Sequence, residues 1–493
     1  MLYQSTRGPE TATPLQAVLK GMAGDGGLFV DPDLLSCKFD WLSCLKKAPL
    51  PRAAMILSAL LPDFEDMPGL VERAYAGKFE TPDITPLVDV GNMYVLELFR
   101  GPTAAFKDVA LSMLPQLITA ARTQTGMRQK IMILTATSGD TGKAALHGFA
   151  DVAGTGIIVF YPSEGVSPIQ KIQMITQPGE NVRVCGVKGN FDDCQRGVKR
   201  AFAALNQAGI PAQNGAALSS ANSINIGRLA PQVTYYFSAY GDLLARGQIR
   251  LGDPVDFVVP TGNFGDILAG FFARCMGLPV GRLVCASNAN NVLTDFLRTG
   301  VYDQRRPFHR TSSPSMDILV SSNLERLLYY AAEGDTRRVS DWMGQLSENG
   351  YYRVDRETLG RIQAVFSAGC CDEAQTAQTI RRVWAERHYL CDPHTAVAFA
   401  VAERYMAEEK PGRPVVVLST ASPYKFPGAV LPALGGDPDG GAFAQMAALQ
   451  ALTGVPIPQS LQGLQTLPVR HFDCIAPQQL TDYVASHLSG KGE

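Results

Sequence analysis

The sequence has little net charge and lacks long apolar runs. Its 44 lysine and arginine residues are nearly matched by 46 aspartate and glutamate residues, which gives a formal net charge of −2. Proteins that bind polyanions usually carry an excess of positive charge, so nucleic acid is not expected as a partner. No apolar stretch reaches the roughly 18 residues that a membrane-spanning helix needs, so no membrane span is expected.

Patterns of metal binding and of disulfide frameworks are also missing. The ten cysteines are scattered, with Cys370 and Cys371 adjacent and no CxxC pair, and the six histidines include no HExxH motif. Neither a metal site nor a disulfide framework is therefore expected. The N-terminal residues MLYQSTRGPETATPLQAVLK lack the charged start and apolar run of a secretory signal, which predicts a cytoplasmic protein.

The length of the chain predicts several domains. Its 493 residues exceed the roughly 100–200 that are typical of one domain. Residues before about Val88 are rich in proline and helix-like, with little strand signal. The expected units are an N-terminal domain at 1–88, a smaller α/β domain at 89–250, a larger α/β domain at 251–440 and a C-terminal helical extension at 441–493.

Apolar, β-branched runs that precede Gly/Ser/Thr-rich loops indicate strand–loop–helix units. The strands are expected at Ile131–Leu134, Phe257–Val259 and Val415–Leu418. The loops after them are expected at Thr135–Gly142, Pro260–Asp266 and Ser419–Lys425. This alternation predicts an α/β fold with doubly wound, mostly parallel sheets rather than a sandwich or a bundle. Residues 322–406 are expected to be helical, including the segment ETLGRIQAVFSAG.

The loop TGNFGD, residues 261–266, has the composition of an anion site. In open α/β sheets, ligands bind beyond the carboxyl ends of the strands, where helix N-termini offer free N–H groups. Gly262 and Gly265 permit unusual backbone angles and Asp266 can cap the next helix, so a phosphate group is the expected ligand. Glycine-rich turns also occur where nothing binds, and for one loop alone both interpretations stay open.

Two nucleotide-binding motifs are absent. The segment TSGDTGK resembles a P-loop, but Thr137 stands where the first glycine belongs, and Ala144 follows Lys143 where serine or threonine is needed. No strand is followed by a complete GxGxxG spacing. These departures argue against an ATPase and against a dinucleotide-binding site.

Lys107 is a candidate reactive amine. It lies in LFRGPTAAFKDVALSML and is flanked by Phe106 and Val109. If this apolar face packs inward, desolvation lowers the pKa of the lysine, which suits Schiff-base chemistry. A lysine in the first turn of a surface helix has the same pattern, so periodicity alone does not select Lys107.

Several longer motifs follow one another along the chain. They are YQSTRG, DGGLFV, GPTAAFKD, TATSGDTGKAA, SSANSINIGRLAPQ, PTGNFGDILAG, SPSMDILVSSNLERLLYY, DPHTAVA and STASPYKFP. Together they resemble the threonine synthases of the long, three-part kind, which are fold type II pyridoxal phosphate enzymes related to the tryptophan synthase β chain. The resemblance implies pyridoxal 5′-phosphate as cofactor and a carbon–oxygen lyase acting on phosphates. The implied reaction converts O-phospho-L-homoserine and water to L-threonine and phosphate, the last step of threonine biosynthesis.

The resemblance also implies roles for the residues that bind the cofactor. Lys107 matches the lysine that forms a Schiff base with it. Thr420 matches the hydroxyl residue that faces the pyridine nitrogen. The loop that holds the cofactor phosphate is matched by Gly262, Asn263, Phe264, Gly265 and Asp266.

The implied substrate site comprises two segments. The segment TSGDTG matches the loop whose N–H groups and hydroxyls receive the substrate carboxylate, which implies roles for Ser138, Asp140 and Thr141. Asp140 stands where related dehydratases usually have asparagine, which favours threonine synthase. Asn225 and Arg228 match a segment near the substrate. Arg228 is either a bidentate ligand of the substrate phosphate or part of a structural ion pair.

Two alternatives share these motifs. A threonine-synthase-like phospho-lyase would eliminate phosphate but release 2-oxobutyrate. A catalytically silent binding protein would keep the fold alone, although Lys107, TGNFGD and Thr420 together argue against it. The resemblance implies a small-molecule substrate, no metal and no obligate protein partner.

Overall fold

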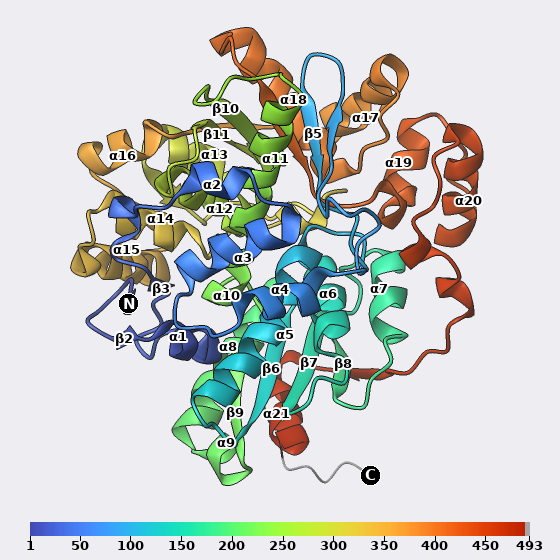
Figure 1. Cartoon of the computed structure of the whole chain (residues 1–493). Helices are drawn as coiled ribbons and strands as arrows, with labels where there is room; N and C mark the ends of the chain where they lie inside the picture. The colour runs from blue at the N-terminus through green and yellow to red at the C-terminus, as the bar shows by residue number, and fades with distance from the viewer. Residues whose placement is uncertain (489–493) are drawn as a thin grey trace.

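Two mostly parallel sheets form the centre of the molecule (Figure 1). The computed structural model describes residues 1–488. The larger sheet has the strand order β14-β11-β10-β15-β5-β4, and the smaller sheet has the order β16-β8-β7-β6-β9. All neighbouring strands in these sheets are parallel except β4 and β5. The expected α/β class with mostly parallel sheets is confirmed.

Each strand expected from the sequence is present, and each is longer than expected. The strands of the larger sheet are β4 (Leu87–Asp89), β5 (Tyr94–Glu97), β10 (Val255–Pro260), β11 (Val280–Ser287), β14 (Phe366–Cys370) and β15 (Val415–Ser419). Those of the smaller sheet are β6 (Lys130–Ala136), β7 (Thr155–Pro162), β8 (Val182–Val187), β9 (Ala216–Ser220) and β16 (Asp473–Ile475).

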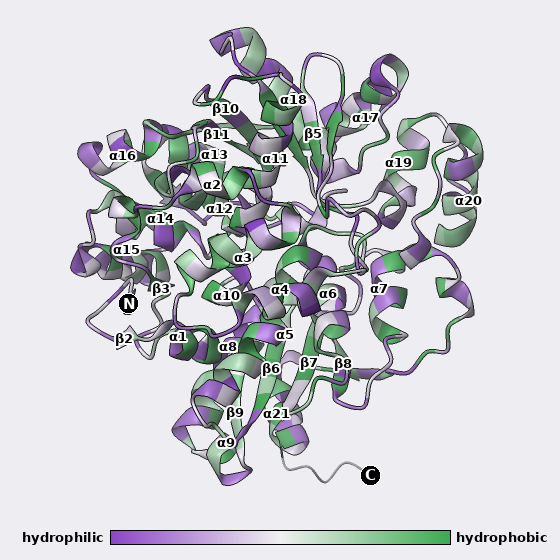
Figure 2. Ribbon diagram, viewed as in Figure 1, coloured by the Kyte–Doolittle hydropathy of each residue, from purple (hydrophilic) through white to green (hydrophobic). Residues whose placement is uncertain are grey.

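Both faces of each sheet are buried, which explains the nearly unbroken apolar runs. In β10, Phe257 and Val259 enter one hydrophobic core while Val258 enters another. In β7, Ile157 faces the first of these cores and Ile158 faces a third. Figure 2 shows the apolar character that runs along β7. Successive side chains therefore alternate between helical layers on opposite faces of a sheet.

Helices form these layers. The helices that follow β5 in the chain are α5 (Lys107–Gln124), α6 (Asp140–Phe149), α7 (Pro168–Ile175), α8 (Phe191–Gln207), α9 (Ile210–Gln213), α10 (Ile226–Leu229), α11 (Val233–Ala245), α12 (Gly265–Cys275), α13 (Val292–Thr299), α14 (Leu324–Ala331), α15 (Thr336–Asn349), α16 (Arg356–Gln363), α17 (Glu373–Arg387), α18 (Pro393–Glu409) and α19 (Pro427–Ala433), with two more near the C-terminus.

The N-terminal segment contains strands as well as helices. Its helices are α1 (Pro14–Lys20), α2 (Trp41–Leu45), α3 (Pro49–Leu60) and α4 (Met67–Tyr75), and its small sheet consists of β1 (Tyr3–Ser5), β2 (Thr11–Ala12) and β3 (Phe29–Val30). In Figure 1, helices α3 and α4 lie in front of the region between the two sheets.

Two motifs singled out in the sequence, YQSTRG and NLERLL, bind each other. Arg7 donates through two nitrogens to the carboxylate of Glu325 on α14, at 2.9 and 2.7 Å, and the Thr6 hydroxyl donates to the same carboxylate at 2.5 Å. The neighbouring Arg326 is fully buried and donates to the backbone carbonyl of Phe29 at 3.0 Å. These contacts fix the N-terminal segment to helix α14.

Two strands lie in one expected domain but pair with strands of another. Strand β5 lies within the expected smaller domain, 89–250, but pairs with β15 of the larger sheet. The expected C-terminal helical extension, 441–493, includes α20 (Ala442–Thr453) and α21 (Leu480–Leu488), but its strand β16 pairs with β8 of the smaller sheet. The last five residues of that segment lie outside the described residues. The sheets therefore do not follow the expected boundaries.

The expectation of helix throughout residues 322–406 is wrong at two places. The short strand β13 (Tyr351–Arg353) pairs with β12 (Val301–Asp303), and β14 runs parallel to β11. Strand β14, with the sequence FSAGC, contains no β-branched residue, so its composition does not predict a strand. Its pairing with β11, which is distant in the sequence, stabilises the extended conformation.

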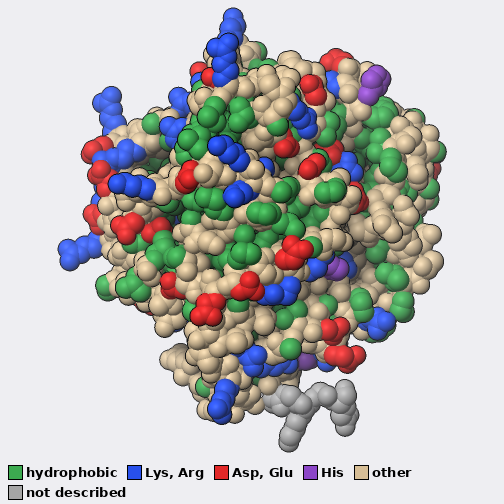
Figure 3. Space-filling view, viewed as in Figure 1, with side chains coloured by type: hydrophobic (Ala, Val, Ile, Leu, Met, Phe, Trp, Pro, Cys, Tyr) green, Lys and Arg blue, Asp and Glu red, His purple; other side chains and the backbone are tan. Residues whose placement is uncertain are grey.

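The surface carries charges of both signs. On the face drawn in Figure 3, acidic and basic side chains are interspersed rather than gathered into areas of one sign. This distribution agrees with the near-zero net charge of the chain. Between residues 1 and 488, no helix combines the length and the apolarity needed to cross a membrane.

Candidate active site

The carboxyl ends of strands from both sheets meet at one cavity. Segments that follow β6, β9, β10 and β15 line it, together with the start of α5. All the site residues expected from the sequence except Asn225 contribute to this lining: Lys107, Ser138, Asp140, Thr141, Arg228, Gly262, Asn263, Phe264, Gly265, Asp266 and Thr420. The arrangement is that of open α/β sheets, which bind ligands beyond the carboxyl ends of their strands.

Lys107 is the first residue of α5 and is buried, with 8% of its surface exposed. The apolar face of the helix packs inward, as a desolvated lysine requires. The Lys107 Nζ lies 4.3 Å from the centre of the Phe106 ring and 3.8 Å from Asp140 Oδ2. Burial lowers the pKa of Lys107 to about 8, although the Asp140 carboxylate opposes this shift. The amine is therefore much easier to deprotonate than an exposed lysine.

The TGNFGD loop differs in detail from the expectation. The residue with a left-handed backbone is Phe264, with φ of 61°, and neither Gly262 nor Gly265 has a positive φ. Gly262 is required for another reason, since a Cβ there would lie 2.4 Å from the backbone oxygen of Ser315. Helix α12 begins at Gly265, and the N–H groups of a first helical turn have no acceptors within the helix.

Asp266 does not cap α12, contrary to the expectation. It is the second residue of the helix, and its Oδ1 accepts hydrogen bonds from the hydroxyls of Tyr235, at 2.5 Å, and Tyr236, at 3.2 Å. Burial raises the pKa of Asp266 to about 7 even though both tyrosines oppose the shift. The carboxyl group can thus be protonated near neutral pH, and in that form it donates a hydrogen bond.

The TSGDTG loop leads directly into α6. The Thr137 hydroxyl accepts hydrogen bonds from the N–H groups of Gly139, at 2.9 Å, and Gly142, at 2.8 Å. Gly139 has a φ of 136°, which only glycine adopts without strain. The loop therefore folds back on itself and places the first turn of α6, which begins at Asp140, beside the cavity. Backbone N–H groups at such a helix start attract anions.

The Asp140 side chain is bound to other protein groups. Lys425 Nζ lies 2.5 Å from its Oδ1, and Gln170 Nε2 donates to the same oxygen at 2.7 Å. Although burial alone would raise the pKa of Asp140, the charges of Lys425 and Lys107 hold it well below its usual range. An anionic side chain repels a substrate carboxylate, so only the N–H groups and hydroxyls of this loop suit that ligand.

Arg228 is buried beside the cavity, with 3% of its surface exposed. Its Nη1 donates to the backbone oxygen of Ala221, and its Nε has no hydrogen-bond partner. Burial lowers its pKa to about 10, and no carboxylate among residues 1–488 forms an ion pair with it. A structural ion pair is thus not formed within the described part of the chain, which leaves the guanidinium available to an anionic ligand.

Asn225 does not line the cavity. Its side chain accepts a hydrogen bond from the Gly227 N–H at 2.9 Å and so caps α10. Its amide nitrogen donates to the backbone oxygens of Val18, at 2.9 Å, and Ser220, at 3.1 Å. These contacts tie α10 to α1 and position Arg228, which lies three residues further on.

The structure adds cavity residues that sequence reasoning missed. His394 Nε2 accepts a hydrogen bond from the Ser315 N–H at 3.1 Å, and its Nδ1 lies 2.5 Å from Asp392 Oδ2. Because Nε2 accepts, we assign the proton to Nδ1, which donates to Asp392. The DPH motif in the sequence could have indicated His394, since Asp392 caps the buried helix α18 and orients the His394 ring. Thr420 follows β15 and is also buried.

The cavity presents polar atoms that need a partner. Asp266 Oδ2, Arg228 Nε and Ser315 Oγ are buried side-chain atoms without a hydrogen-bond partner, and all three residues line this cavity. Unpaired buried polar groups cost free energy, so a polar ligand there would stabilise the site. A primary amine, a helix N-terminus and a guanidinium with a free Nε fit a ligand that carries an aldehyde and a phosphate.

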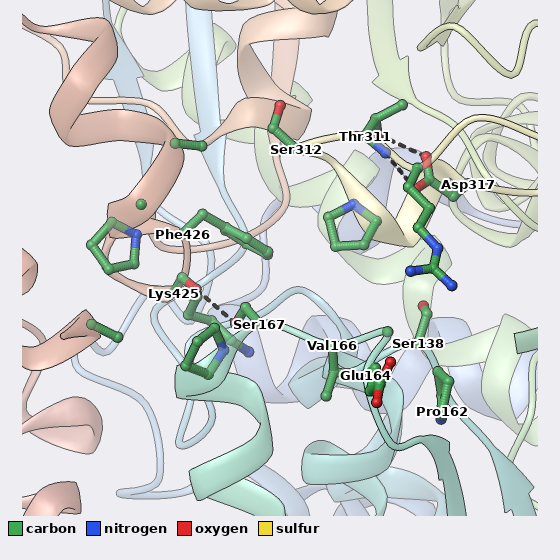
Figure 4. A pocket seen from close by; sticks show the side chains of 18 of the residues that line it. Ser138, Pro162, Glu164, Val166, Ser167, Thr311, Ser312, Asp317, Lys425 and Phe426 are labelled. Atoms are coloured by element: carbon green, nitrogen blue, oxygen red, sulfur yellow. Dashed lines mark hydrogen bonds between the residues drawn. The ribbon is translucent and has the colours of Figure 1, made fainter. Parts of the chain in front are cut away.

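A larger cavity of about 540 Å³ lies beside the first and shares Ser138 with it. Figure 4 shows Glu164 and Ser167 on one side of this second cavity and Thr311 and Asp317 on the other. Its lining includes residues from segments that follow strands of both sheets, among them Ser138 and Lys425.

Comparisons with known proteins agree with this geometry. Residues 80–353 match the family model "Pyridoxal-phosphate dependent enzyme", and residues 395–480 match "Threonine synthase, C-terminal". The chain is 38% identical over 470 residues to threonine synthase of Saccharomyces cerevisiae, which covers 88% of this chain and 89% of that one. It is 40% identical over 435 residues to human threonine synthase-like 1, but spans only 58% of that relative's length while 85% of this chain is covered.

Solved structures show the same relationship. PLP-bound threonine synthase from Brucella melitensis has a TM-score of 0.84 at 36% identity, covering 99% of this chain and 100% of that one. Yeast threonine synthase has a TM-score of 0.86 at 34% identity, covering 99% of each chain. The chain therefore belongs to the threonine synthase family of pyridoxal-phosphate-dependent enzymes.

Proposed function

We propose that this protein is a threonine synthase that converts O-phospho-L-homoserine and water to L-threonine and phosphate. The observation that carries the proposal is the meeting of Lys107, the start of α12 and Arg228, whose Nε has no hydrogen-bond partner, in one buried cavity. The first two suit an aldehyde and a phosphate of the cofactor, and the third suits the phosphate of a substrate. Fold type II and a biosynthetic role belong to the same proposal.

The cofactor site uses residues of both sheets. Gly262, Asn263, Phe264, Gly265 and Asp266 would hold the phosphate of pyridoxal phosphate at the start of α12, with Thr420 beside the ring nitrogen. A protonated Asp266 would donate to that phosphate rather than repel it. When bound, the cofactor stabilises the negative charge that develops on a substrate carbon after loss of a proton.

The substrate would be held at both ends. The N–H groups and hydroxyls of Ser138, Asp140 and Thr141 would bind its carboxylate, while Arg228 would bind its phosphate and stabilise the charge on the leaving group. As a free amine lining the same cavity, Lys107 would lie beside the substrate carbons. With a pKa of about 8 it can both accept and donate protons near neutral pH, as removal and return of protons at Cα and Cβ require.

One alternative is supported by a specific observation. Several relatives at 38–41% identity are named threonine synthase-like 1 rather than threonine synthase. A phospho-lyase of this kind would share the elimination of phosphate but release 2-oxobutyrate and ammonia. The joint presence of Lys107, the TGNFGD loop and Thr420 at one cavity argues against a silent binding protein.

Product analysis distinguishes these functions. The purified protein, supplied with pyridoxal phosphate and O-phospho-L-homoserine, is expected to form threonine and phosphate in equal amounts. Formation of 2-oxobutyrate and ammonia without threonine would instead identify the phospho-lyase, and no turnover would identify the binding protein. Borohydride reduction followed by peptide mapping is expected to place the cofactor on Lys107 in the active enzyme.

The cellular setting is part of the proposal. All ten cysteines are free thiols, and several are buried, which fits a reducing compartment such as the cytoplasm. We propose that the substrate is a small molecule and that no nucleic acid, membrane or obligate protein partner takes part. Fractionation of cells that express a tagged full-length chain would test the location.

A further inference from the structure

Two lysines compete for one carboxylate at the cavity. Lys425 ends the short helical turn Pro423–Lys425, which follows β15 of the larger sheet, and Asp140 begins α6, which follows β6 of the smaller sheet. Lys425 is fully buried and Asp140 is 2% exposed. Their ion pair at 2.5 Å therefore joins the carboxyl ends of the two sheets.

The contacts of Asp140 favour Lys425 over Lys107. The Asp140 Oδ1 contacts both Lys425 Nζ and Gln170 Nε2. Its Oδ2 lies 3.8 Å from Lys107 Nζ, which is beyond ordinary hydrogen-bond distance. Gln170 is itself confined, because a Cβ at Gly139 would lie 2.4 Å from its side chain. The carboxylate is thus held on the side away from Lys107.

Lys425 is also held firmly. Its Nζ donates to the backbone oxygen of Thr103 at 3.1 Å, and its own backbone oxygen accepts from the Ser167 hydroxyl at 3.0 Å, a contact drawn in Figure 4. Thr103 belongs to the turn that precedes Lys107. Lys425 therefore links the turn before the reactive lysine to the aspartate beside it.

We propose that Lys425 is a positioning residue: by holding the Asp140 carboxylate, it prevents a tight ion pair between Asp140 and Lys107 and leaves the Lys107 amine free to react with an aldehyde. This inference rests on the proposed function, in which Lys107 carries the cofactor. It goes beyond that function because it assigns a task to a residue outside the cofactor and substrate contacts.

The charges around Lys107 support this assignment. The groups that act on it are Asp140, Lys425, Arg228 and Asp266. After desolvation, Asp140 and Asp266 raise the pKa of Lys107, whereas Lys425 and Arg228 lower it. A buried lysine in direct contact with a carboxylate keeps its proton, so the placement of Asp140 influences what fraction of the amine is neutral near pH 7.

The test measures how the reactivity of Lys107 depends on pH. Pyridoxal phosphate is added to the protein freed of cofactor, from about pH 6 to about pH 10, a range that brackets the expected pKa. The adduct is reduced with borohydride, and the labelled Lys107 peptide is quantified by mass spectrometry. The readout is the pH midpoint of the attachment rate rather than the rate itself, because charge changes also alter the binding of an anionic reagent.

The two members of the pair should shift this midpoint in opposite directions. Lys425→Met frees Asp140 to pair with Lys107, so the midpoint should rise by about one unit or more, and the reactive fraction at pH 7 should fall about tenfold. Asp140→Asn removes the carboxylate, so the midpoint should fall. The matched control is Lys143→Met, another lysine of lowered pKa on α6 that is not among the groups acting on Lys107.

Three outcomes are distinguishable. Opposite shifts in the two variants, with the control unchanged, support the inference. Unchanged midpoints, or shifts in the same direction, overturn the inference about Lys425. If wild-type Lys107 is nevertheless labelled, the proposed function stays intact. Absence of label on wild-type Lys107 overturns both. If Lys425→Met shows no cooperative thermal unfolding, Lys425→Gln replaces it, and the near-isosteric Asp140→Asn variant gives the opposite sign independently.

Discussion

Replacement of Gly262 by alanine is expected to weaken cofactor binding without preventing folding. An added Cβ would lie 2.4 Å from the backbone oxygen of Ser315, about 1 Å closer than an ordinary van der Waals contact. Ser315 cannot easily move away, because its N–H donates to the buried His394 at 3.1 Å. The loop at the start of α12 must therefore shift instead, and with it the N–H groups that would bind the cofactor phosphate.

The size of the effect follows from the cost of overpacking. Forcing an extra carbon into a tightly packed site typically costs about 1–3 kcal/mol. If this strain is borne mainly by the cofactor-bound state, the dissociation constant should rise about five- to 150-fold, since about 1.4 kcal/mol corresponds to a factor of ten. Titration of the cofactor-free variant with pyridoxal phosphate, followed by absorbance, measures this change.

Gly265→Ala is the matched control. It lies in the same loop, but a Cβ there would meet no atom closer than 3.5 Å, and its φ is not positive. Its cofactor affinity should stay within about twofold of wild type, because ordinary contacts cost little. Thermal unfolding without cofactor shows whether either variant is misfolded. Equal affinities for wild type and Gly262→Ala, or equal losses in both variants, would refute the packing argument.

Three further predictions concern the lysine, the aspartate and the N-terminal contact. Lys107→Ala should lose both the borohydride-trapped label and turnover, and turnover retained without added amines would contradict its role. Because burial raises the pKa of Asp266 from 3.8 to about 7, the folded state holds a proton that the unfolded state releases. Wild-type stability should accordingly fall relative to Asp266→Asn between about pH 4 and pH 7 and level off above, as chemical denaturation would show. Arg7→Ala removes the charged partner of the mostly buried Glu325 and should cost about 1–3 kcal/mol in the same assay, whereas Arg305→Ala, at an exposed ion pair, should change little.

Local sequence patterns predicted much of the fold. Strands β6, β10 and β15 lie where apolar runs precede small-residue loops, because both faces of each sheet are buried. Strand β14 was not predicted, since the extended conformation of FSAGC depends on pairing with β11 rather than on its own composition. The sequence also did not predict that β5 and β16 pair with strands outside their expected domains. Strand partners depend on contacts between distant segments and not on local sequence.

The candidate site was predictable as a set of loops but not as a set of contacts. The motifs located the cavity lining, yet the left-handed residue at Phe264 and the tyrosine contacts of Asp266 depend on neighbours far along the chain. Lys425 occurs in a motif that was recognised, but its ion pair with Asp140 crosses from one sheet to the other. Only the folded chain shows that these charges meet.

The pairing of β16 with β8 has a consequence for synthesis of the protein. Strand β16 lies at residues 473–475, whereas the other strands of its sheet end by residue 220. During translation, the edge of β8 therefore remains uncovered while more than 250 further residues are added. An uncovered strand edge can pair with another chain, so the growing polypeptide is exposed to aggregation through β8 until its last strand emerges from the ribosome.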